Sequence, residues 1–244
     1  MDAPLQDRIA LITGASRGIG AAVAIGFAAA GAHVVLVART VGGLEEVDDA
    51  IQAVGGSATL VPLDLTEAGG IEQLGASVYE RWGRLDVLVG NAAMLGELSP
   101  VGHIEPEIWR QAFELNVHAN WRLIRAFDPL LRRSAAGRAI FVTSGATRSL
   151  PPYWAAYSAS KAALEALVVT YAREIERTAI RVNLVNPGPT RTAMRAQAFP
   201  GEDPERLPPP EHLVETLVRL ASPAFSGHGL WIPADQSAPL SSLT

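Results

Sequence analysis

The chain has 244 residues, no cysteine and a formal net charge of −5 at pH 7. The absence of cysteine excludes a disulfide scaffold, a thiolate metal site and a thiol nucleophile, and the acidic balance argues against a general nucleic-acid-binding protein. A mean hydropathy of +0.18 with only 18% charged residues is apolar for a soluble monomer, which indicates either buried subunit interfaces or a deep core.

The amino-terminal region carries no basic stretch ahead of an apolar run, which argues against a secretory signal. The stretch 21–38 is nearly free of charge, but its Ala-rich first half has a helical pattern, and its β-branched second half is typical of a strand. We therefore expect a buried helix followed by a buried strand, no contact with membranes and a cytoplasmic protein.

Apolar runs alternate with longer amphipathic stretches along the whole chain. The expected strands are 8–13, 33–38, 58–63, 86–90, 138–143, 181–185 and 230–232, and the expected helices are 18–30, 44–54, 71–82, 105–133, 155–177 and 211–221. Continuously apolar strands are buried on both faces, and strands that alternate with helices form a parallel sheet with right-handed crossovers. The pattern predicts a doubly wound, Rossmann-like α/β fold of about seven parallel strands with helices on both faces, in a single domain over residues 1–244.

Proline is concentrated in one segment. Seven of the 17 prolines fall between Pro187 and Pro210, together with the acids Glu202, Asp203 and Glu205. A long irregular segment in a compact domain is usually a binding loop or a lid. We expect residues 189–210 to form a substrate lid; the alternative is a surface connection with no role in binding.

A glycine-rich turn, TGASRGIG over residues 13–20, follows the first expected strand and opens the first expected helix. Gly14 permits a tight turn, while Gly18 and Gly20 leave room for a pyrophosphate and for packing of the helix on the strand. The helix amino terminus adds free N–H groups and a partial positive charge for phosphate. The candidate cofactor contacts in this turn are Gly14, Ser16, Arg17, Gly18, Ile19 and Gly20.

The end of the second expected strand bears on the choice of cofactor. An NAD-binding fold usually carries an acid there, but this chain has Ala38 followed by Arg39, and Arg17 lies in the glycine-rich turn. Two guanidinium groups near the adenosine ribose would bind a 2′-phosphate. We therefore expect NADP(H) rather than NAD(H); the alternative is that both arginines are solvated surface residues.

Polar and small residues end the next two expected strands. Asp64 could accept a hydrogen bond from the adenine amino group, or could start a helix together with Thr66. The small side chains after the fourth strand would let the backbone lie against the adenosine ribose. The candidate contacts at these two strand ends are Asp64, Leu65, Asn91, Ala92 and Ala93.

Tyr157 and Lys161 are spaced i, i+4 in an expected helix, which puts both on one face. A neighbouring ammonium favours the phenolate, and would lower the pKa of the tyrosine toward the neutral range. Ser144 follows the fifth strand at the carboxyl edge of the sheet, where open α/β folds bind ligands, and Asn116 could hold a water that links Lys161 to solvent. The alternative for Lys161 is a solvated position on the helix surface.

Together these motifs resemble the short-chain dehydrogenase/reductase family over essentially the whole chain. The resemblance is carried, in the family's order and approximate spacing, by TGASRGIG (13–20), Asp64, NAA (91–93), Asn116, Ser144, YSASK (157–161) and NPG (186–188). It implies that a hydride moves between nicotinamide C4 and a carbonyl carbon, with Asn116, Ser144, Tyr157 and Lys161 as the catalytic residues.

The resemblance also assigns a role to each of these residues. Tyr157 would be the general acid in reduction and the general base in oxidation, and Lys161 would lower its pKa and bind the nicotinamide ribose. Ser144 would orient the substrate, and Asn116 would support the proton relay. Further cofactor contacts implied beside the nicotinamide carboxamide are Pro187, Gly188, Thr190 and Thr192.

Residues 186–207 further resemble a bacterial subgroup of this family, the YciK-type oxidoreductases.

Two features depart from the family pattern. Ala93 stands where glycine is usual, which would weaken cofactor binding if the backbone there were left-handed. The ending WIPADQSAPLSSLT lacks the usual glycine pair. Many members pack this end against a partner subunit, so we expect a homodimer through the helices at 105–133 and 155–177, with a homotetramer as the alternative.

Two functions remain open at this point. The first is an NADP(H)-dependent reductase or dehydrogenase that acts on a small-molecule carbonyl or alcohol. The second is a non-catalytic NADP(H)-binding sensor or scaffold, which the presence of all four reacting residues disfavours. The five histidines show no metal-ligand spacing, so no metal is expected. The aromatic pair at 153–154 could line a substrate pocket or pack the helix start, and Met194 and Phe199 could contact substrate.

Overall fold

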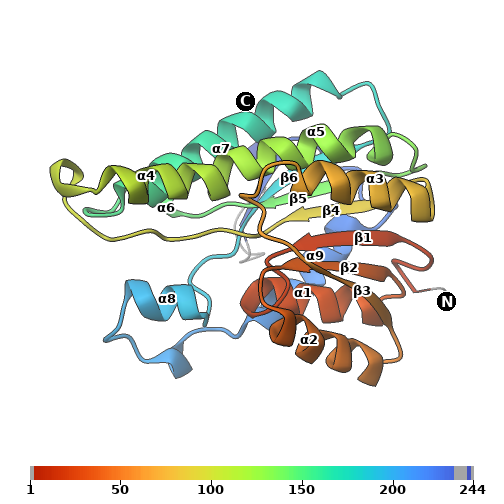
Figure 1. Ribbon diagram of the computed structural model, residues 1–244, viewed down its shortest axis with the longest axis horizontal. Helices are drawn as coiled ribbons and strands as arrows, with labels where there is room; N and C mark the ends of the chain where they lie inside the picture. Colours follow the sequence, from red (N-terminus) through yellow and green to blue (C-terminus); the bar gives the residue numbers. More distant parts are fainter. Residues whose placement is uncertain (1–2, 234–240, 243–244) are drawn as a thin grey trace.

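The computed structural model describes residues 3–233 and 241–242, and one sheet runs through them (Figure 1). The strands are β1 (Ile9–Thr13), β2 (His33–Ala38), β3 (Ser57–Pro62), β4 (Val87–Gly90), β5 (Arg138–Val142), β6 (Arg181–Asn186), β7 (Leu230–Pro233) and β8 (Ser241–Ser242), in the spatial order β3-β2-β1-β4-β5-β6-β7-β8. β1 to β7 pair in parallel, and β8 pairs antiparallel with β7. The expected doubly wound sheet of seven parallel strands is confirmed, with a short antiparallel strand added.

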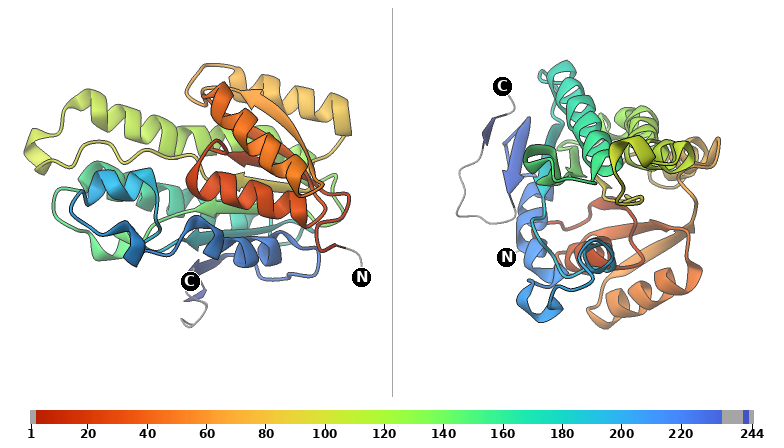
Figure 2. Two further views of the ribbon diagram at one scale, coloured as in Figure 1. Left: turned by 90° about the horizontal axis from the view of Figure 1, so that it is seen from below. Right: turned by 90° about the vertical axis from the view of Figure 1, so that its left-hand side faces the viewer.

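Helices cover both faces of the sheet (Figures 1 and 2). One layer contains α3 (Gly70–Trp82), α4 (Pro106–Phe113), α5 (Ala119–Leu131) and α7 (Ala155–Glu174), and the other contains α1 (Gly18–Ala29), α2 (Val41–Ala53) and α9 (Val214–Ala221). The short helices α6 (Ala146–Ser149) and α8 (Ala193–Ala198) lie beyond the carboxyl ends of the strands. Within the described residues no helix is long and apolar enough to span a membrane.

Successive residues of each strand contribute to two different cores. On β1, Ile9 and Leu11 pack in the core beneath α3, α5 and α7, whereas Ala10 and Ile12 pack in the core beneath α1, α2 and α9. Because both faces of the sheet are covered, the strands carry apolar runs on both faces rather than apolar residues at every second position. This explains why the strand ends agree with the sequence-based expectation to within one residue.

The helix expected over 105–133 is interrupted. It consists of α4, a π turn over Glu114–His118 and then α5, with Pro129 inside α5. A π turn accommodates one extra residue and occurs often at functional sites. This turn contains Asn116, which is completely buried. The other expected helices differ from the structure by at most three residues at either end.

β1 lies at the point where the strand order reverses, between β2 and β4. In its register with β4, Ile12 is opposite Val89, so the glycine-rich turn after β1 lies beside the loop after β4. Open α/β sheets bind ligands in the crevice at the carboxyl ends of such strands. The fold therefore brings the motifs after β1, β2, β4, β5 and β6 to one edge of the sheet.

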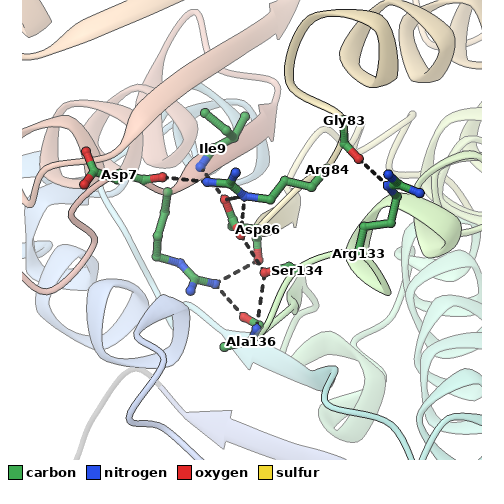
Figure 3. Close-up of polar contacts among 9 residues, drawn as sticks. Asp7, Ile9, Gly83, Arg84, Asp86, Arg133, Ser134 and Ala136 are labelled. Carbon is green, nitrogen blue, oxygen red and sulfur yellow. Dashed lines mark hydrogen bonds and ion pairs between the residues drawn. The ribbon is translucent and has the colours of Figure 1, made fainter.

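The opposite, amino edge of the sheet contains a buried polar network centred on Asp86 (Figure 3). Its carboxylate accepts hydrogen bonds from the Ile9 N–H at 2.9 Å, the Ser134 hydroxyl at 2.5 Å and the Arg84 Nε at 3.1 Å. The buried Arg8 donates to the main-chain oxygens of Asp86 and Ala136. These contacts connect β1, β4 and the segment before β5, so this edge has a structural role.

Candidate active site

A cleft of about 1960 Å³ opens at the carboxyl edge of the sheet. Residues of α4, α6 and α8 contribute to its walls. In Figure 1, α4 and α6 lie above α8 on the side where the strands end. Every site residue expected from the sequence lies on the wall of this cleft except Gly20 and Asn116. These two residues do not line the cleft and are described separately below.

The glycine-rich turn has the backbone that the sequence predicts. Gly14 and Gly18 have φ angles of 65° and 57°, in the left-handed region that favours glycine. A Cβ on Gly20 would overlap the carbonyl oxygen of Gly14, so Gly20 lets α1 start directly against the turn. No side chain caps the first turn of α1, and its N–H groups remain available to a phosphate.

Two residues that the sequence reasoning did not emphasise hold this turn against the loop after β4. The Thr13 hydroxyl accepts hydrogen bonds from the N–H groups of Asn91 and Ala92, at 3.0 and 3.1 Å. In return, the Asn91 side-chain amide donates to the main-chain oxygen of Thr13 at 2.9 Å. The side chain of Asn91 therefore supports the turn, and the signal was its position opposite a threonine at the end of the neighbouring strand.

Arg17 and Arg39 both line the outer end of the cleft. The Arg39 side chain is 73% exposed, and its guanidinium lies 3.7 Å from the carboxylate of Asp64. Burial by itself would raise the pKa of Asp64, but hydrogen bonds from Thr66 and the charge of Arg39 lower it overall. The carboxylate of Asp64 is thus already paired, and the side chains of Arg17 and Arg39 both border this end of the cleft.

Ala93, which replaces the family's usual glycine, has no backbone strain. The non-glycine residues with positive φ among those described are Asp7, Leu150 and Tyr153, and Ala93 is not one of them. The conformation that would have required glycine is therefore not adopted at this position. The ending of the chain, where the second departure falls, lies mostly in residues 234–240 and 243–244, outside the described part.

Tyr157 and Lys161 lie on the face of α7 that borders the cleft, and both are almost fully buried. A hydrogen bond joins the side chains of Tyr157 and Ser144. The Lys161 Nζ donates to the Val142 main-chain oxygen at 2.8 Å and lies 5.9 Å from the centre of the Tyr157 ring. Lys161 is the only lysine in the whole sequence.

The pKa of Tyr157 differs from the sequence-based expectation. Burial raises the pKa of its phenol, and the hydrogen bond from Ser144 opposes this only in part. Burial also lowers the pKa of Lys161 to about 8, while the carboxylate of Glu165 acts in the opposite direction. In the structure, Tyr157 is therefore protonated at neutral pH, and the expected lowering of its pKa by Lys161 does not outweigh burial.

Asn116 lies behind the cleft rather than in its wall. Its side-chain Nδ2 donates to the Met94 main-chain oxygen at 3.0 Å and to the Ser160 hydroxyl at 2.9 Å, and its Oδ1 accepts from the Met94 N–H at 2.9 Å. Both amide protons are thus used by protein groups. The side chain thus joins the π turn, the loop after β4 and α7, and the water expected at Asn116 stays a prediction.

An apolar wall surrounds Tyr157. Leu95, Ala146, Met194, Ala198 and Trp154 pack around its ring. Phe199 extends the wall, with its ring 5.5 Å from that of Trp154. Trp154 therefore lines the cleft, whereas Tyr153 is largely exposed and does not.

The proline-rich segment borders the same wall from the far side of the cleft. After β6 it forms α8 and a 3-10 turn over Pro204–Arg206. Two ion pairs stabilise it, Arg191 with Glu205 at 2.7 Å and Arg195 with Glu202 at 2.6 Å. Its cations are consequently neutralised where they approach the cleft.

A family model described as "short chain dehydrogenase" matches residues 8–203 of the chain. The chain belongs to the short-chain dehydrogenase family. Among its relatives, the Escherichia coli (strain K12) oxidoreductase YciK is 37% identical over 243 residues, which cover 98% of this chain and 91% of the relative. A crystal structure of YciK superimposes with a TM-score of 0.90 at 36% identity, covering 96% of this chain and 98% of that one. The expected resemblance to YciK-type members is confirmed.

Short-chain dehydrogenases with bound cofactor are also similar to this chain. One from Shigella flexneri, complexed with NADP, has a TM-score of 0.92 and 36% identity, and covers 96% of this chain and 99% of its own. One from Escherichia coli CFT073, complexed with NADPH, has a TM-score of 0.89 and 35% identity, with the same coverage. This chain is accordingly a member of a family of nicotinamide-dependent oxidoreductases that act on small molecules.

Proposed function

We propose that this short-chain dehydrogenase is an NADP(H)-dependent carbonyl reductase, and in the reverse direction an alcohol dehydrogenase, with Tyr157 as its proton donor and acceptor. One observation carries the proposal. A buried tyrosine, hydrogen-bonded to Ser144, lies beside the chain's only lysine at the inner end of a dinucleotide-sized cleft.

The residues at the outer end of the cleft fit NADP(H). The glycine-rich turn and the uncapped start of α1 would hold the pyrophosphate, and Arg17 and Arg39 would bind the 2′-phosphate. The small residues after β4 would lie against the adenosine ribose, and those of the 187–192 segment beside the nicotinamide. When bound, the cofactor supplies or accepts the hydride. The relatives complexed with NADP and NADPH support this choice.

The residues at the inner end of the cleft would transfer the proton to and from the substrate oxygen. With its raised pKa, the phenol of Tyr157 is protonated at neutral pH and can donate to the oxygen of a carbonyl substrate. Ser144 would donate a second hydrogen bond to the same oxygen and orient it. The ammonium of Lys161 would stabilise the negative charge that develops on Tyr157 when its proton leaves. Asn116 would act as a positioning residue through Ser160 and Met94.

The substrate would be a small carbonyl or alcohol with an apolar body. Trp154, Met194 and Phe199 provide an apolar surface beside Tyr157, and the two arginines of the 189–210 segment that line the cleft, Arg191 and Arg195, are paired with acids. Such walls, with a few polar groups for orientation, are typical of small-molecule sites. In this proposal residues 189–210 are the lid, since α8 carries part of the wall.

The test is an NADPH-oxidation screen of ketones, aldehydes and quinones with the purified protein, followed by kinetics of Tyr157→Phe. We expect turnover of at least one class, and a fall of about 10²–10⁴-fold in kcat for the variant with unchanged NADPH affinity. An unaltered kcat in Tyr157→Phe would overturn the mechanism. Tight NADPH binding with no turnover across the panel would instead favour the non-catalytic sensor.

We further propose a homodimer through the α4–α5 and α7 surfaces. Trp109 and Trp121 project from α4 and α5 as large exposed apolar side chains. Light scattering that gives the mass of a monomer at micromolar concentration would exclude this assembly.

A further inference from the structure

A second buried charged group lies on α7 one turn beyond Lys161. Glu165 is only 6% exposed, and together with Tyr157 and Lys161 it forms a series at i, i+4 and i+8 along one face of the helix. Acids are rarely buried unless they are paired or hydrogen-bonded. The proton transfer described above assigns no role to this carboxylate.

The carboxylate of Glu165 accepts four hydrogen bonds from three other elements. Its Oε1 lies 2.6 Å from the Thr143 hydroxyl, 2.9 Å from the Thr147 hydroxyl and 3.1 Å from the Trp231 indole nitrogen. Its Oε2 accepts from the Arg148 guanidinium at 2.6 Å. Four donors suit an ionised carboxylate, which has no proton of its own to give.

Three successive residues at the end of β5 each contact one member of this α7 series. The Val142 main-chain oxygen binds the Lys161 Nζ, the Thr143 hydroxyl binds Glu165, and Ser144 is hydrogen-bonded to Tyr157. The Thr147 hydroxyl lies 2.9 Å from the main-chain oxygen of Ser144 as well as 2.9 Å from Glu165, so its single proton is shared between these two acceptors. The backbone that presents Ser144 is therefore fixed to α7 at three successive positions.

We propose that Glu165 is a positioning residue of this site: its carboxylate stabilises the charged form of Lys161 and holds the end of β5 that presents Ser144 to Tyr157. The inference deepens the proposed function and rests on it. Its electrostatic part concerns Lys161 alone and can be measured without any substrate.

The charged groups around Lys161 determine whether a substitution raises or lowers its pKa. On α7 the titratable side chains that face it are Tyr157 and Glu165, and Arg148 of α6 lies on the far side of the carboxylate. On α4 and the π turn, the acids and bases pair with each other at the surface, Glu107 with Arg110 and Glu114 with His118. From β5, Lys161 meets a main-chain oxygen that does not titrate.

Two substitutions should therefore move the titration of Lys161 in opposite directions. Burial lowers the pKa of Lys161 to about 8, and the negative charge of Glu165 opposes that lowering. Glu165→Gln keeps the shape but removes the charge, so the pKa should fall further, by about one unit. Arg148→Ala removes the cation that partly neutralises the carboxylate, so the pKa should rise. The Arg148 side chain is 53% exposed, and the three other donors to the Glu165 carboxylate remain in this variant.

The experiment is an NMR pH titration of the chain labelled with carbon-13 at the lysine Cε. Because the sequence contains one lysine, an expression product without added lysines gives one lysine resonance. We expect the midpoint near pH 8 in the unmodified protein, lower in Glu165→Gln and higher in Arg148→Ala. Glu174→Gln is the matched control, because it removes the same charge from an exposed position at the end of the same helix, about 20 Å from Lys161, and should leave the midpoint unchanged.

The pH profile of kcat/KM for carbonyl reduction gives the second readout. The apparent pKa of its high-pH limb should be lower in Glu165→Gln and higher in Arg148→Ala than in the unmodified protein. A purely structural role would instead lower kcat/KM by the same factor at every pH. Shifts of one sign in both variants, or no shift in either, would overturn the inference while Tyr157-dependent activity stands. Opposite NMR shifts in a protein with no reductase activity would overturn the proposed function but leave the Glu165–Lys161 coupling intact.

Discussion

The two edges of the sheet use buried charge in opposite ways. At the amino edge, Arg138 donates to five main-chain oxygens, and Asp86 accepts from three different partners. At the carboxyl edge, the Lys161 Nζ donates to one main-chain oxygen among the described residues. The difference indicates where charge stabilises the fold and where it is kept available for a ligand.

The effect of burial on the two cations reflects this difference. Burial lowers the pKa of Arg138 to about 10, which leaves it charged at neutral pH. Burial lowers the pKa of Lys161 to about 8, close enough to neutral that its charge responds to neighbouring groups. A group of this kind is suited to supporting a proton transfer, while the fully hydrogen-bonded arginine is suited to joining strands.

The largest expected effect is on activity at the carboxyl edge. Lys161→Met should lower kcat/KM for carbonyl reduction by at least about 100-fold, because the charge that stabilises the Tyr157 phenolate is removed. The free energy of unfolding should change by less than about 1 kcal/mol, since the desolvation cost of the buried ammonium is removed together with its one hydrogen bond and Glu165 keeps its own donors. Kinetics and urea unfolding of the same preparation check both parts; a clear loss of stability would contradict the comparison.

At the amino edge the expectation is reversed. Asp86→Ala should lower the free energy of unfolding by about 3–5 kcal/mol, because it leaves the buried Ile9 N–H and Ser134 hydroxyl without their acceptor and removes the negative charge beside the buried Arg8. The folded fraction should keep the kcat and KM of the unmodified protein. Urea unfolding measures the change, with Asp49→Ala on the exposed face of α2 as control. If Asp86→Ala altered kcat as strongly as stability, the two edges would not be separate in function.

The smallest effect concerns the outer end of the cleft, where charge is exposed. Arg39→Asp should reduce the ratio of kcat/KM for NADPH to that for NADH by about 10–100-fold, since it replaces a partner of the 2′-phosphate with an acid. Arg177→Asp, an exposed site in the turn after α7, makes the same charge change and should leave the ratio unaltered. An unmodified protein that already prefers NADH would rule out the assignment of Arg17 and Arg39.

Most of the fold could be predicted from the sequence, because its signals are local. The strands are largely apolar runs. The turn after β1 has left-handed conformations at Gly14 and Gly18, and glycine at these two positions indicates such a turn in the sequence. The i, i+4 spacing of Tyr157 and Lys161 likewise places both on one face of whatever helix they form. Parallel pairing then brings every strand end to one edge, which is why nearly all expected site residues line the cleft.

Contacts between distant segments could not be predicted in this way. The π turn depends on how α5 packs, and the apolar period shows no sign of the extra residue. The side-chain amide of Asn116 is hydrogen-bonded to Met94 and Ser160, 22 and 44 positions away, and the sequence does not indicate these partners. The interaction of Thr13 with Asn91 joins residues 78 positions apart.

The sequence by itself determined the order of the elements, the glycine-rich turn and which side chains are candidates for the proposed reaction. The tertiary structure decided their electrostatics. It raised the pKa of Tyr157, lowered that of Lys161 and surrounded Glu165 with donors from β5, α6 and β7. The physical reason is that desolvation and charge–charge interactions depend on distances through space, which neighbouring positions in a sequence do not specify.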